Sequence, residues 1–129
     1  MPGWMADIEE ATLANDAFRR VLYTGRSLQL TVMSLAPGGE IGLEVHEGLD
    51  QFLRIEQGRA EVLMGPSREE LTERQELGAD WAVIVPAGTW HNVVNRGDEP
   101  LKLYSIYAPP EHPEGTLHQT KADAEAAEA

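Results

Sequence analysis

The sequence contains no cysteine among its 129 residues. Disulfide frameworks, thiolate metal sites and cysteine nucleophiles are therefore excluded, and the composition suits a reducing compartment. No apolar run approaches the roughly 18 residues that a membrane-spanning helix needs. The first ten residues also lack the basic start and apolar core of a signal peptide. We therefore expect a cytoplasmic protein with no membrane partner.

Positive charge is scarce as well. Ten Lys and Arg residues stand against 22 Asp and Glu residues, which gives a formal net charge of -12. A surface of this sign repels nucleic acid and anionic lipid, so we expect neither of them as a partner. The 42% of hydrophobic residues and 25% of charged residues are ordinary for a globular protein. The length fits a single domain over residues 1–129.

Short apolar runs recur about every ten residues and are separated by Gly, Pro or charged clusters. Such spacing is typical of a sandwich or barrel. With eight or so strands, the pattern predicts an all-β jelly roll or barrel whose interior holds one small ligand. The expected strands are Phe18 to Tyr23, Leu28 to Leu35, Ile41 to His46, Phe52 to Ile55, Ala60 to Met64, Trp81 to Val85, His91 to Asn95 and Leu101 to Ala108.

The remaining segments are less regular. We expect an N-terminal arm over residues 1–15, the barrel over 16–108, and a C-terminal arm with a frayed acidic tail over 109–129, since three prolines follow Ala108. Residues 65–78 form either a helical turn capped by Ser67 or a charged connection between strands. Gly58 marks a candidate tight hairpin, because glycine adopts the positive φ that such turns need.

Four side chains with oxygen or nitrogen donors mark a candidate metal site. Glu44 and His46 are two residues apart on a predicted strand, so both point to the same face. Gln51 begins the next apolar run, and His91 follows a Pro-x-Gly turn. Donors that converge in this way from separate strands would hold a divalent metal ion.

The two stretches that carry these donors resemble the two motifs of the cupin superfamily. The first motif is matched in every spacing, and the second in full. The residues at the motif positions are Gly38, Glu44, His46, Gln51 and Gly58 for the first motif and Pro86, Gly88, His91 and Asn95 for the second. The resemblance implies a double-stranded β-helix, usually dimeric, with a metal inside one end of the barrel. It implies no single reaction, because cupins include dioxygenases, isomerases, decarboxylases, lyases, sugar-binding domains and storage proteins.

The sequence departs from the family pattern at two ligand positions. Glu44 stands where the first histidine of the family motif usually stands, and Gln51 stands where its glutamate usually stands. A Glu, His, Gln, His set keeps the formal charge and suits manganese, iron, nickel or zinc. Gln51 has two alternative roles, orienting a ligand or bonding the backbone. Glu44 has two as well, a solvated carboxylate or a general base.

We therefore predict a homodimeric, metal-dependent enzyme of isomerase, lyase or dioxygenase type that acts on a small polar organic molecule. Glu44 and Tyr104 are its candidate catalytic residues. One alternative is a non-catalytic module that binds or senses a sugar or another small molecule, with or without metal. Another is a degenerate cupin that has lost its metal. His112 and His118 match neither motif, and we expect them to fix the C-terminal arm to the barrel or to a dimer mate.

Overall fold

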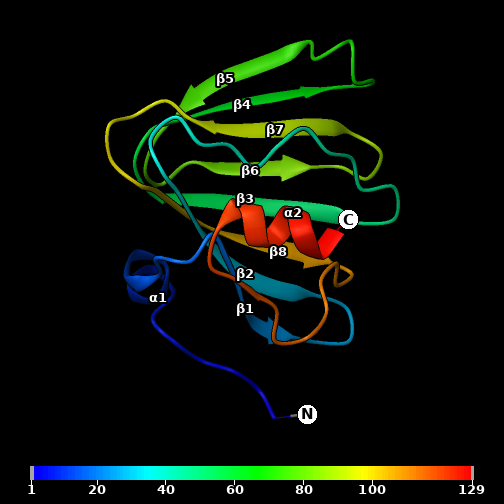
Figure 1. The fold of residues 1–129 in the computed structure, drawn as a ribbon. Helices are drawn as coiled ribbons and strands as arrows, with labels where there is room; N and C mark the ends of the chain where they lie inside the picture. Colours follow the sequence, from blue (N-terminus) through cyan, green and yellow to red (C-terminus); the bar gives the residue numbers. More distant parts are fainter. Residues whose placement is uncertain (1, 129) are drawn as a thin grey trace.

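The computed structural model describes residues 2–128, and these form nine strands and two short helices (Figure 1). The strands make two antiparallel sheets, one ordered β6-β3-β8-β2-β1-β9 and the other β5-β4-β7. This confirms the predicted all-β fold. In chain order the elements are α1 (Ile8–Ala14), β1 (Arg19–Thr24), β2 (Gln29–Leu35), β3 (Asp50–Gln57), β4 (Ala60–Gly65), β5 (Glu73–Leu77), β6 (Ala82–Val85), β7 (Trp90–Asn95), β8 (Leu101–Ala108), β9 (Leu117–His118) and α2 (Lys121–Glu128).

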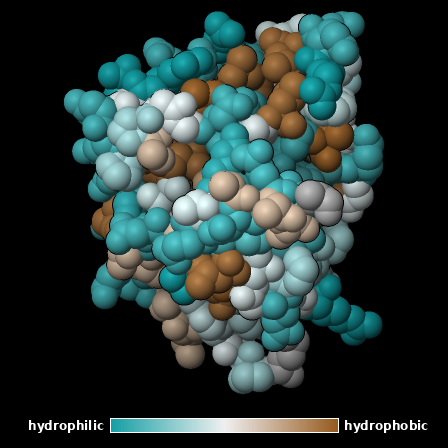
Figure 2. Space-filling view, viewed as in Figure 1, coloured by the Kyte–Doolittle hydropathy of each residue, from teal (hydrophilic) through white to brown (hydrophobic). Residues whose placement is uncertain are grey.

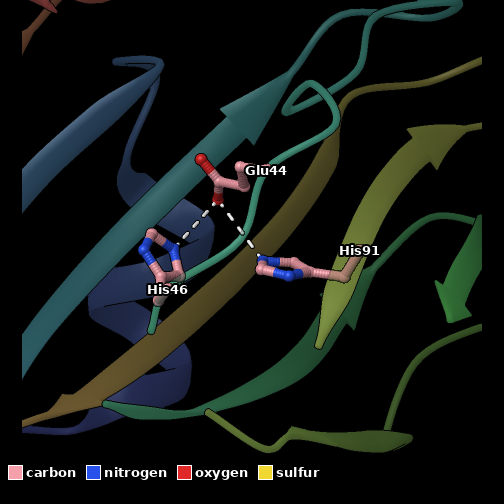
Figure 3. Close-up of side chains that lie close together, drawn as sticks. All are labelled: Glu44, His46 and His91. Atoms are coloured by element: carbon pink, nitrogen blue, oxygen red, sulfur yellow. Dashed lines mark hydrogen bonds and ion pairs between the residues drawn. The ribbon is translucent and has the colours of Figure 1, made fainter. Parts of the chain in front are cut away.

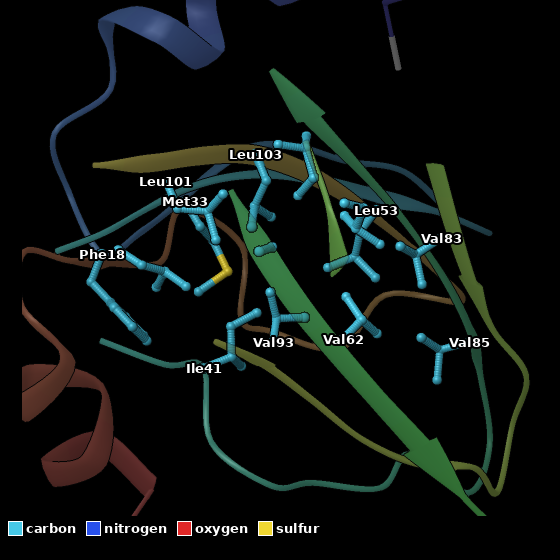
Figure 4. Close-up of a cluster of buried hydrophobic side chains, with 14 of the residues drawn as sticks. Phe18, Met33, Ile41, Leu53, Val62, Val83, Val85, Val93, Leu101 and Leu103 are labelled. Carbon is cyan, nitrogen blue, oxygen red and sulfur yellow. The ribbon is translucent and has the colours of Figure 1, made fainter. Parts of the chain in front are cut away.

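The hydrophobic core lies between the two sheets (Figure 4). Strand alternation places its members: Leu53 and Ile55 on β3, and Leu101 and Leu103 on β8, are each at most 1% exposed. Burying one such side chain stabilises the fold by about 1.5–3 kcal/mol. The same alternation continues beyond the apolar stretch, so the next inward residues of these strands are polar. Gln51 and Ser105 are also buried, at 2% and 0% exposure.

The turn at Gly58 is a corner between sheets, and the predicted tight hairpin is wrong. Strand β3 pairs with β6 and β8, whereas β4 pairs with β5 and β7. Gly58 has a φ of 97°, and a Cβ placed there would lie 3.2 Å from the Cα atom of Leu101. Only glycine fits this corner without strain, because it tolerates both the φ and the close approach.

The predicted strand from Ile41 to His46 is also wrong as a continuous strand. This segment makes only isolated bridges to β7, at Glu40 and at Glu44. Gly42 interrupts the extended backbone with a φ of 109°, and its N–H donates to Oδ1 of Asn92 at 2.9 Å. The segment therefore follows β7 as an irregular extra strand.

Two further segments differ from expectation. Residues 73–77 form β5, which pairs with β4, so neither of the two alternatives, a helical turn or a charged connection, holds over these residues. Residues 121–128 form α2 where a frayed tail was expected. The backbone N–H of Asp123 donates to Oγ1 of Thr120, and the N–H of Thr120 donates to the carboxylate of Asp123, which caps the helix. Ala124 is 3% exposed and joins the core, so α2 packs on the barrel. Ala129 lies outside the described residues.

The face of the molecule in Figure 2 is mostly hydrophilic, and its hydrophobic residues form separate patches. This distribution agrees with the large net charge of -12. Within residues 2–128, neither helix has the length and hydropathy that crossing a membrane would require.

Candidate metal centre

Glu44, His46 and His91 meet between the irregular segment 40–46 and strand β7 (Figure 3). One ligand atom from each residue lies within 4.8 Å of those of the other two. Oε1 of Glu44 is 3.3 Å from Nε2 of His46 and 3.4 Å from Nε2 of His91. The two imidazole rings are 5.4 Å apart between centroids. Three of the four predicted ligands are therefore brought together.

Main-chain hydrogen bonds hold this arrangement. The N–H of His91 donates to the carbonyl of Glu44 at 2.9 Å, and the N–H of Glu44 donates to the carbonyl of His91 at 3.0 Å. Residues that exchange both bonds lie directly opposite one another, so their side chains leave the same face. The N–H of Gly88 donates to the carbonyl of His46 at 2.8 Å, which ties the Pro-x-Gly turn to the first motif.

A main-chain carbonyl orients the His91 ring. Its side chain is 1% exposed, and Nδ1 lies 3.0 Å from the carbonyl oxygen of Thr89. A carbonyl oxygen only accepts hydrogen bonds, so Nδ1 donates to it and Nε2 is the ring nitrogen that faces the cluster. Within the described chain, Nε2 makes no hydrogen bond, although it faces the carboxylate of Glu44. Metal-binding histidines are oriented by the same kind of bond from the other ring nitrogen.

The cluster keeps its carboxylate ionised. Burial alone would raise the pKa of Glu44, but the interactions with His46 and His91 outweigh it and lower that pKa to about 2. Burial likewise lowers the pKa of His46, and the interaction with Glu44 more than compensates, so that pKa is raised. A positive charge beside the carboxylate of Glu44 favours its ionised form.

Gln51, the fourth predicted ligand, lies on β3 and is 2% exposed. Its Nε2 donates to Oγ of Ser105 at 2.8 Å, which leaves Oε1 buried without a hydrogen-bond partner in the described chain. Gln51 is paired with Tyr107 across the sheet, and the Tyr107 ring is 5.9 Å from that of His46. The free amide oxygen is the donor type that the sequence predicts for this position, and Glu44, His46 and His91 form a group that could hold a metal ion.

The structure does not bring Tyr104 to this cluster. Tyr104 lies on the outer face of β8, where its ring is 6.0 Å from that of Phe52. Tyr107 takes the inner position instead, with 1% exposure, and burial raises its pKa to about 12. Counting by twos from the buried Leu103 places Tyr107 inside, so strand alternation was the available signal.

The C-terminal arm lies against the same cluster. Oε1 of Glu111 is 3.7 Å from Nδ1 of His46, and the His112 ring meets the Tyr107 ring edge-on with centroids 5.1 Å apart. Gln29 holds this part of the arm: its Oε1 accepts from the N–H groups of Glu111 and His112, and its Nε2 donates to the carbonyl of His112 at 2.7 Å. His118 is paired with β1 through β9, so both histidines lie where the arm meets the barrel.

The chain is similar in sequence and structure to known proteins of one family. Residues 31–107 match the cupin domain family. The chain is 58% identical over 125 residues to the uncharacterized protein YrkC of Bacillus subtilis, covering 97% of this chain and 67% of that protein. It is 38% identical over 115 residues to the uncharacterized protein L612 of Acanthamoeba polyphaga mimivirus, covering 88% of this chain and 70% of the relative. The crystal structure of BH2720 from Bacillus halodurans superposes with a TM-score of 0.96 at 55% identity, covering 97% of this chain and 95% of that one. The family match, the two antiparallel sheets and the motif residues at the cluster all agree. The chain therefore belongs to the cupin domain family.

Proposed function

We propose that this protein is a metal-dependent enzyme that acts on a small polar organic molecule. The observation that carries the proposal is the contact between Glu44 and His91. Nε2 of His91 faces a carboxylate oxygen of Glu44 at 3.4 Å, while Nδ1 of the same ring is held by the carbonyl of Thr89. A half-buried carboxylate that faces two imidazole nitrogens at 3.3 and 3.4 Å is an arrangement in which one cation can be shared by all three side chains. A divalent metal ion satisfies both groups together with His46.

The donor set narrows the kind of ion. Glu44, His46 and His91, with Gln51 as the fourth ligand, offer two nitrogen and two oxygen atoms. Such a mixed set suits manganese, iron, nickel or zinc. When bound, an ion of this kind supplies Lewis-acid stabilisation of negative charge on a substrate oxygen.

The chain's own residues have separable roles. With a pKa of about 2, Glu44 is a poor proton acceptor, so we assign it to metal binding ahead of general base catalysis. Tyr107 keeps its proton at neutral pH because its pKa is raised to about 12. Its buried hydroxyl group is suited to donating a hydrogen bond to an enolate-like oxygen. These roles favour isomerase or lyase chemistry over oxygen-dependent cleavage.

The alternative is a non-catalytic module that binds a small molecule without metal. The bridging position of Glu44 favours it, because a proton on either imidazole would also satisfy the cluster. Metal content separates the two functions, since a proton leaves no metal in the purified protein.

The test begins with metal analysis of protein purified without chelators. We expect near-stoichiometric metal in the wild type, its loss in His91→Ala, and its retention in the control His118→Ala, whose histidine lies outside the cluster. A screen of small hydroxy and oxo compounds is then run before metal removal, after it, and after re-addition. Wild-type protein without metal, or turnover that survives metal removal, would contradict the proposal.

A further inference from the structure

Unpaired polar atoms in the interior extend beyond the proposed metal centre. Over residues 2–128, the buried side-chain nitrogen and oxygen atoms without a hydrogen-bond partner are Nε of Arg19, Oγ1 of Thr31, Oε1 of Gln51, Nε2 of His91 and Nε2 of His112. Gln51 and His91 are explained by the metal. The other three need another partner, because leaving buried polar groups unpaired costs free energy.

Two of these three side chains, Arg19 and Thr31, lie on the inner face of the larger sheet, and His112 lies on the C-terminal arm. On β1, Arg19 pairs with Met33 of the core, so Arg19 faces inward. Thr31 is two residues from Met33 on β2 and faces the same way. Thr31 pairs in turn with Ser105 of β8, whose hydroxyl accepts the hydrogen bond from Gln51. Buried polar side chains thus run from Thr31 through Ser105 to Gln51, a proposed metal ligand, and Arg19 lies diagonally across from Thr31 on the neighbouring strand.

Arg19 is a buried cation, and among residues 2–128 its one carboxylate within 4.0 Å belongs to an exposed side chain. Arg19 is 3% exposed, and its Nη1 lies 3.4 Å from Nδ1 of His118 and 4.0 Å from Oε1 of Glu128. Glu128 is a weak counter-ion at that distance, since its side chain is 65% exposed. The guanidinium group also lies 5.3 Å from the centre of the Phe18 ring. A buried guanidinium group needs a paired anion to offset its desolvation.

The charge of Arg19 also reaches the groups around the centre. It contributes, after burial, to lowering the pKa of His112 to about 4, and it opposes the rise in the pKa of His46. Because Tyr107 contacts the rings of both histidines, these groups share one region of the interior.

We propose that Arg19, with Thr31 and His112, binds a carboxylate group of the substrate, so that the substrate class is a small organic acid. The inference rests on the proposed function, because the second polar group of that acid would occupy the metal centre. Guanidinium groups bind carboxylates through two parallel N–H donors, and Nε of Arg19 is a donor left free for such a bond. A protein of net charge -12 repels anions in general, so the buried positive charge of Arg19 would attract an anion to one specific place.

The test is titration calorimetry with malonate as the probe and malonamide as its uncharged counterpart. We expect malonate to bind the metal-loaded wild type, and malonamide to bind at least tenfold more weakly. Arg19→Gln should weaken malonate binding by at least about tenfold with unchanged metal content, because it removes a charged hydrogen-bond donor. The matched control is Arg20→Gln, since Arg20 is exposed on the same strand, and its affinity should equal that of the wild type.

Other outcomes overturn the inference. If Arg19 only ties α2 to the barrel, Arg19→Gln and Glu128→Gln will lower the melting temperature equally and leave malonate affinity unchanged. If inorganic phosphate binds more tightly than malonate and depends on Arg19, the carboxylate assignment is wrong. Should Arg19→Gln fail to fold, Thr31→Val keeps the side-chain shape, and a several-fold loss of malonate affinity supports the subsite whereas unchanged affinity refutes it.

The two proposals fail in different ways. Malonate binding that ignores Arg19 while metal remains bound refutes the carboxylate subsite and leaves the metal centre standing. Wild-type protein that carries no metal, yet binds malonate through Arg19, refutes the metal centre and keeps the subsite.

Discussion

Replacing Gln51 with leucine should weaken metal binding without destabilising the metal-free protein. Gln51 is 2% exposed, yet only one of its two polar atoms is paired, through Nε2 to Ser105. In a buried environment, such an unpaired acceptor is stable only if something else pairs with it. A bound metal ion is that partner in the proposed site, so function and stability make opposite demands on this residue.

The magnitude follows from the two polar atoms. Removing the unpaired Oε1 relieves about 1–3 kcal/mol, and losing the bond to Ser105 costs about 0.5–1.5 kcal/mol. In the presence of chelator, the free energy of unfolding of Gln51→Leu should therefore be unchanged or about 1 kcal/mol higher. Metal affinity should fall at least tenfold, which removes about 1.4 kcal/mol of the stabilisation that saturating metal provides.

Gln29 is the matched control. It is 0% exposed on β2, and it flanks Tyr107 on the side opposite Gln51. Both polar atoms of Gln29 are paired, to Thr24 and to the backbone of residues 111 and 112. Gln29→Leu leaves these partners unpaired and should cost about 3 kcal/mol or more.

The assay is urea unfolding of both variants and the wild type, with chelator and with added metal. Metal affinity is measured separately by competition with a chromophoric chelator. If Gln51→Leu destabilises the metal-free protein by as much as Gln29→Leu and binds metal like the wild type, Gln51 is structural, and the ligand assignment fails.

Three further predictions address catalysis, pH and packing. Tyr107→Phe should lower the turnover found in the substrate screen by at least tenfold, and Tyr104→Phe should not; equal effects would contradict the roles assigned to the two faces of β8. Burial, more than the charge of Arg19, lowers the pKa of His112 from 6.5 to about 4, so the unfolded chain binds this proton first. The chelated protein should therefore lose stability as pH falls from about 6.5 to about 4, and His112→Gln should show a smaller loss in pH-dependent urea unfolding; identical slopes would refute this. A Cβ at Gly65 would overlap the backbone carbonyl of residue 70, so Gly65→Ala should cost about 2 kcal/mol or more in urea unfolding, whereas Gly3→Ala, with nothing within 4 Å, should be neutral.

Sequence patterns predicted most of the strands and three of the clustered donors. Period-two alternation and turn residues are local signals, so they survive without knowledge of the fold. The prediction was wrong where the same local sequence pattern is compatible with two different structures. Gly58 marks a sharp turn in either case, but only the pairing of β3 and β4 with different strands makes it a corner. Gly42 likewise interrupts a stretch whose composition reads as a strand, because a side chain of β7 captures its N–H group.

The sequence by itself determined the cupin motifs, the acidic charge and the donor types of the proposed metal centre. These depend on residue identity and spacing along one strand or turn. Only the tertiary structure decided that Tyr107 replaces Tyr104 beside the histidines, that Arg19 and His112 reach the same interior, and that Gln51 has a free oxygen while Gln29 has none. Those facts depend on which strands become neighbours. Pairing across 50 or more residues of chain leaves no local trace, because it is set by burial of the whole core.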